Sequence, residues 1–150
     1  MGILDRIGTL IRANINDLLD RAEDPEKMLD QIIRDMAEAI REAKAQVLST
    51  IAEEKIIEGN LQRARELAQE WQQKAELAVE KGRDDLAREA LRRKNDYLSN
   101  AQIYEQQLVA QREVVAKLKA DLQALDKQWD ALQARMRRNE LWTGVGRYMR

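Results

Sequence analysis

The chain contains no cysteine and no histidine, and these absences remove much of the side-chain chemistry on which enzymes depend. Without cysteine there is no disulfide framework and no thiol nucleophile, which fits a reducing compartment. Without histidine the commonest metal ligand and general base is missing. The carboxylates are spread at the spacing of helical ion pairs, and no glycine-rich phosphate loop is present. We therefore expect no enzyme activity, no cofactor and no metal site.

Helix-breaking and aromatic residues are also scarce. Phenylalanine is absent, aromatic residues make up 4% of the chain, and Pro25 is the only proline among 150 residues. Ala, Leu, Glu, Lys and Arg together make up more than half of the sequence, a bias typical of long helices and coiled coils. No apolar run is long enough to span a bilayer. The composition predicts an all-α protein.

Neither sign of charge dominates, since the chain has 26 basic and 27 acidic residues and a formal net charge of −1. A modest basic surplus lies towards the end of the chain and is made by Arg135, Arg137, Arg138, Arg147 and Arg150. Nucleic-acid binding requires a sustained basic face. We therefore expect no nucleic-acid partner.

Two apolar stripes between Pro25 and about Asn139 predict the fold. Each advances by alternating steps of four and three residues, the a/d pattern of a left-handed coiled coil. The first stripe consists of Leu29, Ile33, Met36, Ile40, Ala43, Val47, Thr50, Glu54, Ile57, Leu61, Ala64, Ala68, Trp71, Ala75 and Ala78. The second consists of Ala87, Ala90, Lys94, Tyr97, Ala101, Tyr104, Leu108, Gln111, Val115, Leu118, Leu122, Leu125, Trp129, Leu132 and Met136.

The stripes predict a long antiparallel two-helix hairpin over residues 25–140. Its tip lies near residues 81–84, where Gly82 provides the best turn in the region. Folding there makes positions face each other when their numbers sum to 165, as Ile40 and Leu125 do. Several such layers oppose a small residue to a large one, which fills space without overpacking.

One layer of the seam is polar on both sides. Glu54 faces Gln111, and we expect the amide of Gln111 to donate hydrogen bonds to the Glu54 carboxylate, so that the pair sets the register at some loss of stability. The alternative is that the helices splay and admit water at this layer. Gly59 lies off the seam, where a helical glycine lowers stability slightly.

Two tryptophans occupy seam positions. Trp129 lies opposite Met36 and is expected to pack in the seam. Trp71 lies opposite Lys94, and the sequence leaves two interpretations open. The indole covers the aliphatic stem of Lys94, or it stays partly exposed and anchors another protein, because tryptophan is enriched at binding hot spots.

An amphipathic helix is predicted over residues 2–22, within an N-terminal segment of residues 1–23. Asp24 can cap the next helix and Pro25 suits its first position, so the two segments are separate. The apolar stripe of the first helix consists of Ile3, Leu4, Ile7, Leu10, Ile11, Ile15, Leu18 and Leu19. Two interpretations remain open: the stripe lies in a membrane interface, or it docks on a neighbouring protomer or on the hairpin's own base.

Residues 141–150 form an aromatic and basic tail. We expect Gly144 and Gly146 to end the second helix, because glycine is a poor helix former. The tail, which includes Trp142 and Tyr148, then frays, lies on a membrane or a partner, or is the start of further C-terminal helices.

Three separated motifs carry a family resemblance. Met1-Gly2-Ile3-Leu4-Asp5-Arg6 and Asn14-Ile15-Asn16-Asp17-Leu18 open the chain. Ala22-Glu23-Asp24-Pro25-Glu26-Lys27-Met28-Leu29 joins the helices, and Trp71-Gln72-Gln73-Lys74-Ala75-Glu76-Leu77-Ala78 with Asp85-Leu86-Ala87-Arg88-Glu89-Ala90-Leu91 flanks the turn. In order and spacing they resemble phage-shock protein A and the vesicle-inducing protein in plastids, a family within the ESCRT-III-like superfamily.

The resemblance implies a scaffold peripheral to a membrane, either the inner face of the plasma membrane or a thylakoid or plastid inner membrane. The membrane-binding residues would be Ile3, Leu4, Arg6, Ile7, Leu10, Ile11, Arg12, Ile15 and Leu18. Hairpins of the family self-assemble and remodel anionic or stressed bilayers. Some members restrain an AAA+ transcription activator through a tip-proximal tryptophan, and Trp71 is the matching residue.

The resemblance fails only at the end of the chain. Family members continue through further helices that lock neighbours in the polymer, whereas this sequence stops at Arg150. A fragment or a short variant is therefore expected. Two functions compete at this point: a membrane-remodelling scaffold, and a soluble coiled-coil adaptor or regulator whose first helix docks on protein.

Overall fold

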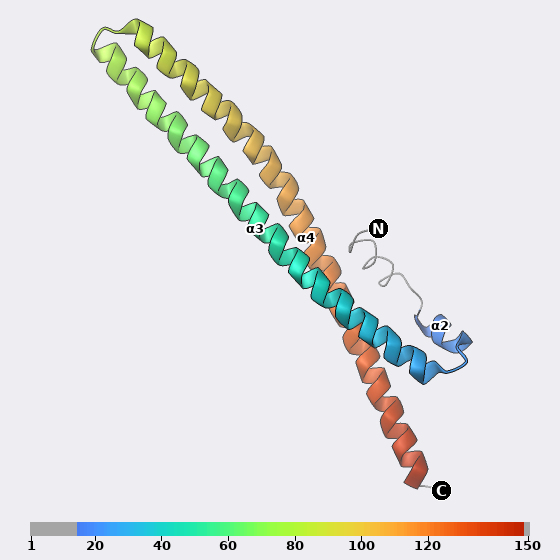
Figure 1. The fold of residues 1–150 in the computed structure, drawn as a ribbon. Helices are drawn as coiled ribbons and strands as arrows, with labels where there is room; N and C mark the ends of the chain where they lie inside the picture. The colour runs from blue at the N-terminus through green and yellow to red at the C-terminus, as the bar shows by residue number, and fades with distance from the viewer. Residues whose placement is uncertain (1–14, 149–150) are drawn as a thin grey trace. The chain divides into compact units, whose positions relative to one another are not determined.

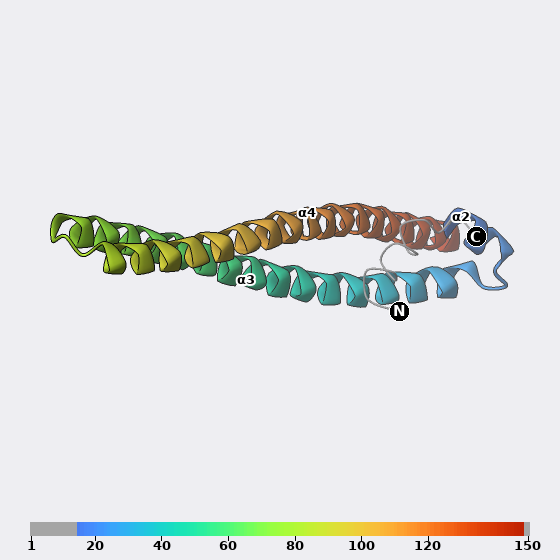
Figure 2. The same ribbon diagram turned by 90° about the horizontal axis from the view of Figure 1, so that it is seen from above.

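The computed structural model describes residues 15–148, with side-chain surroundings through residue 138. Its elements are all helices: α2 (Ile15–Arg21), α3 (Pro25–Glu80) and α4 (Asp84–Tyr148). Figures 1 and 2 show α3 running to a short turn and α4 running back from it beside α3, so the two helices are antiparallel. The all-α antiparallel hairpin that the two stripes predict is confirmed.

The start of α3 follows from its first residues. The backbone N–H of Lys27 donates to Oδ1 of Asp24 at 3.2 Å, and the N–H of Met28 donates to the Asp24 carbonyl at 3.1 Å. Asp24 is therefore the N-cap, as expected. Pro25 occupies the first helical position, where its missing N–H leaves no hydrogen bond unmade.

The turn between α3 and α4 is a glycine C-cap. Gly82 has a φ of 70°, and its N–H donates to the Val79 carbonyl at 3.0 Å. The N–H of Arg83 donates to the Ala78 carbonyl at 2.8 Å. This pair of bonds is the Schellman motif, which satisfies the last carbonyls of a helix and needs a residue in the left-handed region. Gly82 adopts that region without the steric penalty of a Cβ.

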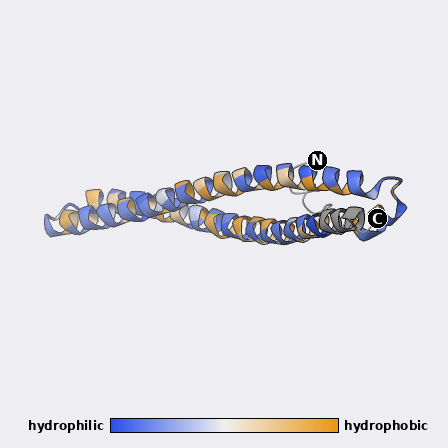
Figure 3. Ribbon diagram, turned by 90° about the horizontal axis from the view of Figure 1, so that it is seen from below, coloured by the Kyte–Doolittle hydropathy of each residue, from blue (hydrophilic) through white to orange (hydrophobic). Residues whose placement is uncertain are grey.

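Contacts divide the chain into two units. The tip unit is Ser49–Val115, and the base unit is Met1–Leu48 with Ala116–Arg150. In the tip unit both helices contribute to a core cluster. It consists of Leu61 and Ala64 from α3 and Ala101 and Leu108 from α4, with Ile57 and Tyr104 packed against them. Residues that the register pairs, such as Leu61 with Tyr104, belong to this same cluster. Figure 3 shows hydrophobic and hydrophilic positions alternating along both helices, as one buried stripe requires.

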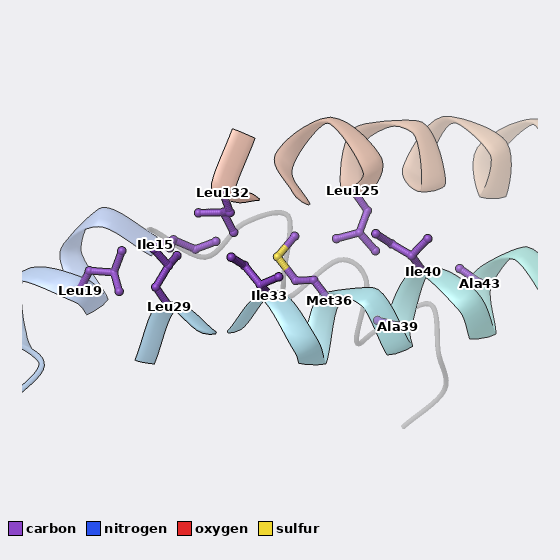
Figure 4. Close-up of a cluster of buried hydrophobic side chains, with 10 residues drawn as sticks. All are labelled: Ile15, Leu19, Leu29, Ile33, Met36, Ala39, Ile40, Ala43, Leu125 and Leu132. Atoms are coloured by element: carbon purple, nitrogen blue, oxygen red, sulfur yellow. The ribbon is translucent and has the colours of Figure 1, made fainter. Parts of the chain in front are cut away.

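The base unit holds a larger cluster to which three helices contribute. It consists of Ile15, Leu19, Leu29, Ile33, Met36, Ala39, Ile40, Ala43, Leu125 and Leu132, and Figure 4 shows these side chains meeting between the ribbons. Ile40 and Leu125, paired by the register, both lie in it. Met36 and Leu125 are fully buried. Trp129 packs against the cluster, as expected for a seam residue.

The predicted hydrogen bond between Gln111 and Glu54 is wrong. The amide of Gln111 donates instead to the carbonyl of Thr50 at 3.1 Å and to Glu53 at 3.0 Å. The Glu54 carboxylate accepts from Nε of Arg112 at 3.2 Å. A guanidinium one position further along the helix competes with the neutral amide, and charge-assisted hydrogen bonds are the stronger ones.

The predicted end of the second helix is also wrong. The backbone of α4 stays helical past Gly144 and Gly146 to Tyr148. A glycine within a helix lowers its stability by about 1 kcal/mol relative to alanine, but it keeps its N–H and its carbonyl. Two isolated glycines therefore weaken this last part of α4 without ending it.

Candidate functional site

A surface hollow in the tip unit lies beside the turn and is called here the tip groove. It has a volume of about 480 Å³ and lies between α3 and α4. Its lining consists of Trp71, Lys74, Leu77, Ala78, Lys81, Arg83, Leu86, Glu89, Ala90 and Arg93. Four of these side chains are cationic and one is anionic. The groove thus combines an apolar floor with a basic rim.

Trp71 closes one end of the groove and is only half-buried. The ammonium of Lys74 lies 4.1 Å from the centroid of the Trp71 ring, and the guanidinium carbon of Arg93 lies 5.1 Å from it. Both distances fall within the range of cation–π attraction, worth about 0.5–1 kcal/mol at exposed sites. Cations from two different helices therefore restrict the indole in its present orientation.

The register places Lys94 opposite Trp71, and the Lys94 ammonium does not reach towards water alone. Lys94 turns its ammonium to the amide oxygen of Gln72, at 2.8 Å across the seam. The cation over the indole is Lys74, which lies three residues along the same helix and hence on the same face. The position opposite Trp71 was predicted from the register, but the rotamer of Lys94 was not.

Two leucines of the groove were missed by the sequence reasoning. The side chain of Leu77 is 51% exposed and that of Leu86 is 49% exposed. Both lie off the seam, so the coiled-coil pattern left them out. The spacing of Lys74, Ala78 and Lys81, at three, seven and ten residues after Trp71, places these other lining residues on one helix face, but this face does not include the two leucines.

A second candidate surface lies in the base unit, where α2 packs on the hairpin. Ile15 and Leu19, one helical turn apart, are 8% and 3% exposed and join the base cluster with Leu29 and Leu132. A guanidinium N–H of Arg135 donates to the side-chain oxygen of Asn16. This part of the predicted first helix therefore docks on its own hairpin, one of the alternatives left open above.

The predicted membrane-binding residues are placed unequally. Those from Ile3 to Arg12 lie outside the described residues. Ile15 is buried against the hairpin, while Leu18, three residues further along α2, is 48% exposed. In this arrangement Leu18 is available to a surface, and Ile15 becomes available only when α2 leaves the cluster.

The part of the chain that the structure describes contains no helix long and apolar enough to cross a membrane. Among the same residues, no group of three or more acidic, cysteine or histidine side chains is arranged to hold a metal ion.

The sequence profile of the PspA/IM30 family matches residues 2–140. The membrane-associated protein Vipp1 of Synechocystis sp. is 44% identical over 126 residues, which cover 84% of this chain and 47% of the relative. The phage shock protein A homolog of Deinococcus radiodurans is 38% identical over 135 residues, covering 90% and 60%. The chloroplastic membrane-associated protein VIPP1 of Arabidopsis thaliana is 30% identical over 126 residues, covering 84% and 38%. The chain spans about half the length of the curated relatives it matches.

Proposed function

Because this chain belongs to the PspA/IM30 family, we propose that it is a peripheral membrane scaffold that binds bilayers through its first helix. In this proposal the hairpins self-assemble and maintain or remodel the membrane. The role is structural and requires no catalytic group or cofactor. The match over residues 2–140 carries the proposal, because it includes both the first helix and the hairpin.

The apolar stripe of residues 1–23 supplies the membrane contact. Its residues would be Ile3, Leu4, Ile7, Leu10, Ile11, Ile15 and Leu18. Burial of their aliphatic side chains at the headgroup boundary would provide most of the attraction. Arg6 and Arg12 would add a preference for anionic lipid, worth about 1 kcal/mol per well-placed charge. We place the protein on the inner face of the plasma membrane, or on a thylakoid or plastid inner membrane.

Exposed apolar side chains on the hairpin support self-assembly. In the tip unit Ile56 is 63%, Val109 55% and Ile103 52% exposed. Such residues are candidates for lateral contacts between hairpins, since each buried methylene group contributes about 0.8 kcal/mol. We therefore propose that the hairpins assemble through these exposed side chains.

Co-sedimentation with anionic liposomes tests the membrane role. Leu10→Glu places a charge in the stripe and should abolish binding while the helical signal and melting of the hairpin persist. Thr9→Glu is the matched control, because the same periodicity places Thr9 opposite the stripe. If Leu10→Glu leaves lipid binding intact but breaks up oligomers, the first helix docks on protein and the scaffold proposal fails.

The tip groove favours a second candidate function, in which the hairpin binds an AAA+ transcription activator through Trp71. The half-buried indole beside two exposed leucines suits an anchor for another protein. Trp71→Ala should weaken binding of the activator's AAA+ domain by at least about tenfold, whereas Leu98→Ala, on an exposed residue elsewhere in the tip unit, should leave it unchanged. Equal affinities for the two variants would remove this candidate.

A further inference from the structure

The tip groove carries more information about its occupant than the presence of Trp71 alone. Its floor is apolar and open, with Leu77 and Leu86 each about half exposed. Its rim carries Lys74, Lys81, Arg83 and Arg93 against the single carboxylate of Glu89. An apolar surface of this kind bordered by one sign of charge is electrostatically complementary to an acidic, amphipathic partner.

We propose that the tip groove binds an acidic amphipathic helix of a partner protein. The apolar side chains of this helix would pack on Leu77 and Leu86, and its carboxylates would form ion pairs with Lys74 and Lys81. This inference deepens the second candidate function, on whose site it rests, by naming the chemistry of the partner segment. The mode is the helix-in-groove recognition that apolar clefts between helices commonly use.

The spacing of the cations favours a helical occupant. Lys74 lies on α3, and Lys81 continues its helical pattern, since the N–H of Lys81 donates to the Leu77 carbonyl at 3.1 Å. Seven residues of helix advance about 10 Å, or two turns. A docked helix with carboxylates at positions i and i+7 presents them at the same interval, with apolar residues at i+3 and i+4 between them.

Small residues leave room for those apolar side chains. Ala78 and Ala90, one from each helix, belong to the groove lining together with the leucines. Ala90 is 4% exposed, so its methyl group belongs to the seam that forms the base of the groove. Trp71 bounds the site at one end, where Lys74 and Arg93 hold its ring. A rigid aromatic anchor of this kind loses little conformational entropy on binding.

Part of the basic rim is already engaged within the chain, which identifies the groups that remain for a partner. Arg83 forms an ion pair with Asp85 at 3.5 Å, and Arg93 forms one with Glu89 at 3.4 Å. Lys74 makes its contact with the face of Trp71, which leaves the ammonium's outer hydrogens directed to solvent or a ligand. Lys74 and Lys81 are therefore the rim residues whose charge reversal tests the proposal.

A selection experiment tests the proposal without knowledge of the natural partner. A stable three-helix scaffold, with one exposed helix face randomised and displayed on phage, is selected against the full chain. The selected faces should carry Asp or Glu seven residues apart around a pair of apolar residues. Their affinity should fall by at least about tenfold for Lys74→Glu with Lys81→Glu, and likewise for Trp71→Ala.

The control is Lys117→Glu with Lys119→Glu, which reverses the same amount of charge at two exposed lysines outside the groove. It should change the affinity of the selected scaffolds by less than about twofold. Thermal melting followed by circular dichroism verifies that each variant is folded. Failure to select any binder, selection of neutral or basic faces, or equal affinity for the rim and control variants would each overturn the proposal.

Two further measurements separate this inference from the functions proposed above. If the rim variant binds anionic vesicles as weakly as Leu10→Glu does, the groove contacts lipid and the helix proposal is wrong. If the AAA+ domain binds the rim variant normally but not Trp71→Ala, the acidic-helix proposal fails while the activator candidate stands. If acidic scaffolds bind as expected but the AAA+ domain does not bind the chain, the activator candidate fails alone.

Discussion

The indole N–H of Trp129 donates a hydrogen bond to the backbone carbonyl of Ile33, at 3.1 Å across the two helices of the base unit. A helical carbonyl has a second lone pair, so this bond joins α4 to α3 without breaking the α3 ladder. The Trp129 ring also packs against the base cluster. Trp129 thus holds α4 against α3 both by packing of its ring and by a hydrogen bond to the backbone.

Trp129→Phe should therefore lower the free energy of unfolding by about 1–2 kcal/mol, because it removes the hydrogen bond and part of the ring. Trp129→Ala should lower it by about 3 kcal/mol, since the packing is lost as well. Urea denaturation followed by circular dichroism measures both changes. A Trp129→Phe variant as stable as the parent would show that the hydrogen bond contributes nothing.

The register can be tested by disulfide formation, because the chain has no cysteine of its own. Ile40→Cys with Leu125→Cys should oxidise within one chain, since a disulfide requires Cα atoms within about 7 Å. Ile40→Cys with Leu118→Cys, one heptad away, is the mismatched pair and should stay reduced. Efficient oxidation of the mismatched pair alone would show that the alignment is wrong.

The two described glycines outside the end of α4 should respond in opposite directions to alanine. Gly82→Ala should lower stability by about 1 kcal/mol, because its φ of 70° is unfavourable for a residue with a Cβ. Gly59→Ala should raise stability by about 0.5–1 kcal/mol, because a Cβ there meets nothing within 4 Å and alanine favours the helix. Melting temperatures of the two variants report the difference, and equal shifts would contradict both assignments.

Arg112 joins the helices of the tip unit and should make stability depend on pH. It donates to Glu54 at 3.2 Å and to Glu58 at 2.8 Å. The hydrogen bond from Arg112, followed by that from Lys55, lowers the pKa of Glu58 below its ordinary 4.5. A lowered carboxyl pKa stabilises the folded state above about pH 4.5, and this contribution is lost as pH falls through the folded-state value.

Arg112→Leu should consequently destabilise the protein at pH 7 and much less at pH 3. Molar salt should also reduce the difference, because these side chains are partly exposed and their charges are screened. Urea denaturation at the two pH values measures the effect. An equal destabilisation at both would mean that Arg112 acts through packing of its aliphatic stem.

The docking of α2 predicts a contrast between adjacent leucines. Leu19 is 3% exposed and Leu18 is 48% exposed. Leu19→Ala should accelerate hydrogen exchange of the α2 amides by about 30-fold, which corresponds to a loss of about 2 kcal/mol of docking free energy. Leu18→Ala should change the exchange by less than about threefold. Similar rates for the two variants would show that α2 is not held by Leu19.

The sequence alone was sufficient for the hairpin, its register and its turn. In a two-helix seam the buried positions repeat regularly along each helix, so the alternating steps of four and three residues between Leu29 and Met136 identify the buried face of each helix. Folding at Gly82 then leaves one alignment that buries both stripes. The cap at Asp24 was equally local, since the carboxylate and the N–H it accepts from lie three residues apart.

The tertiary structure decided which partners the long polar side chains choose and where the first helix docks. Gln111 and Arg112 each bind two groups across the seam, and Lys94 binds Gln72. Small differences in distance and charge select these partners. Periodicity describes helix faces, but it contains no information about rotamers. It likewise shows that the apolar side chains of Ile15 and Leu19 must be covered, but it does not identify the residues that cover them. Leu132, for example, becomes a neighbour of α2 only when the chain returns through α4.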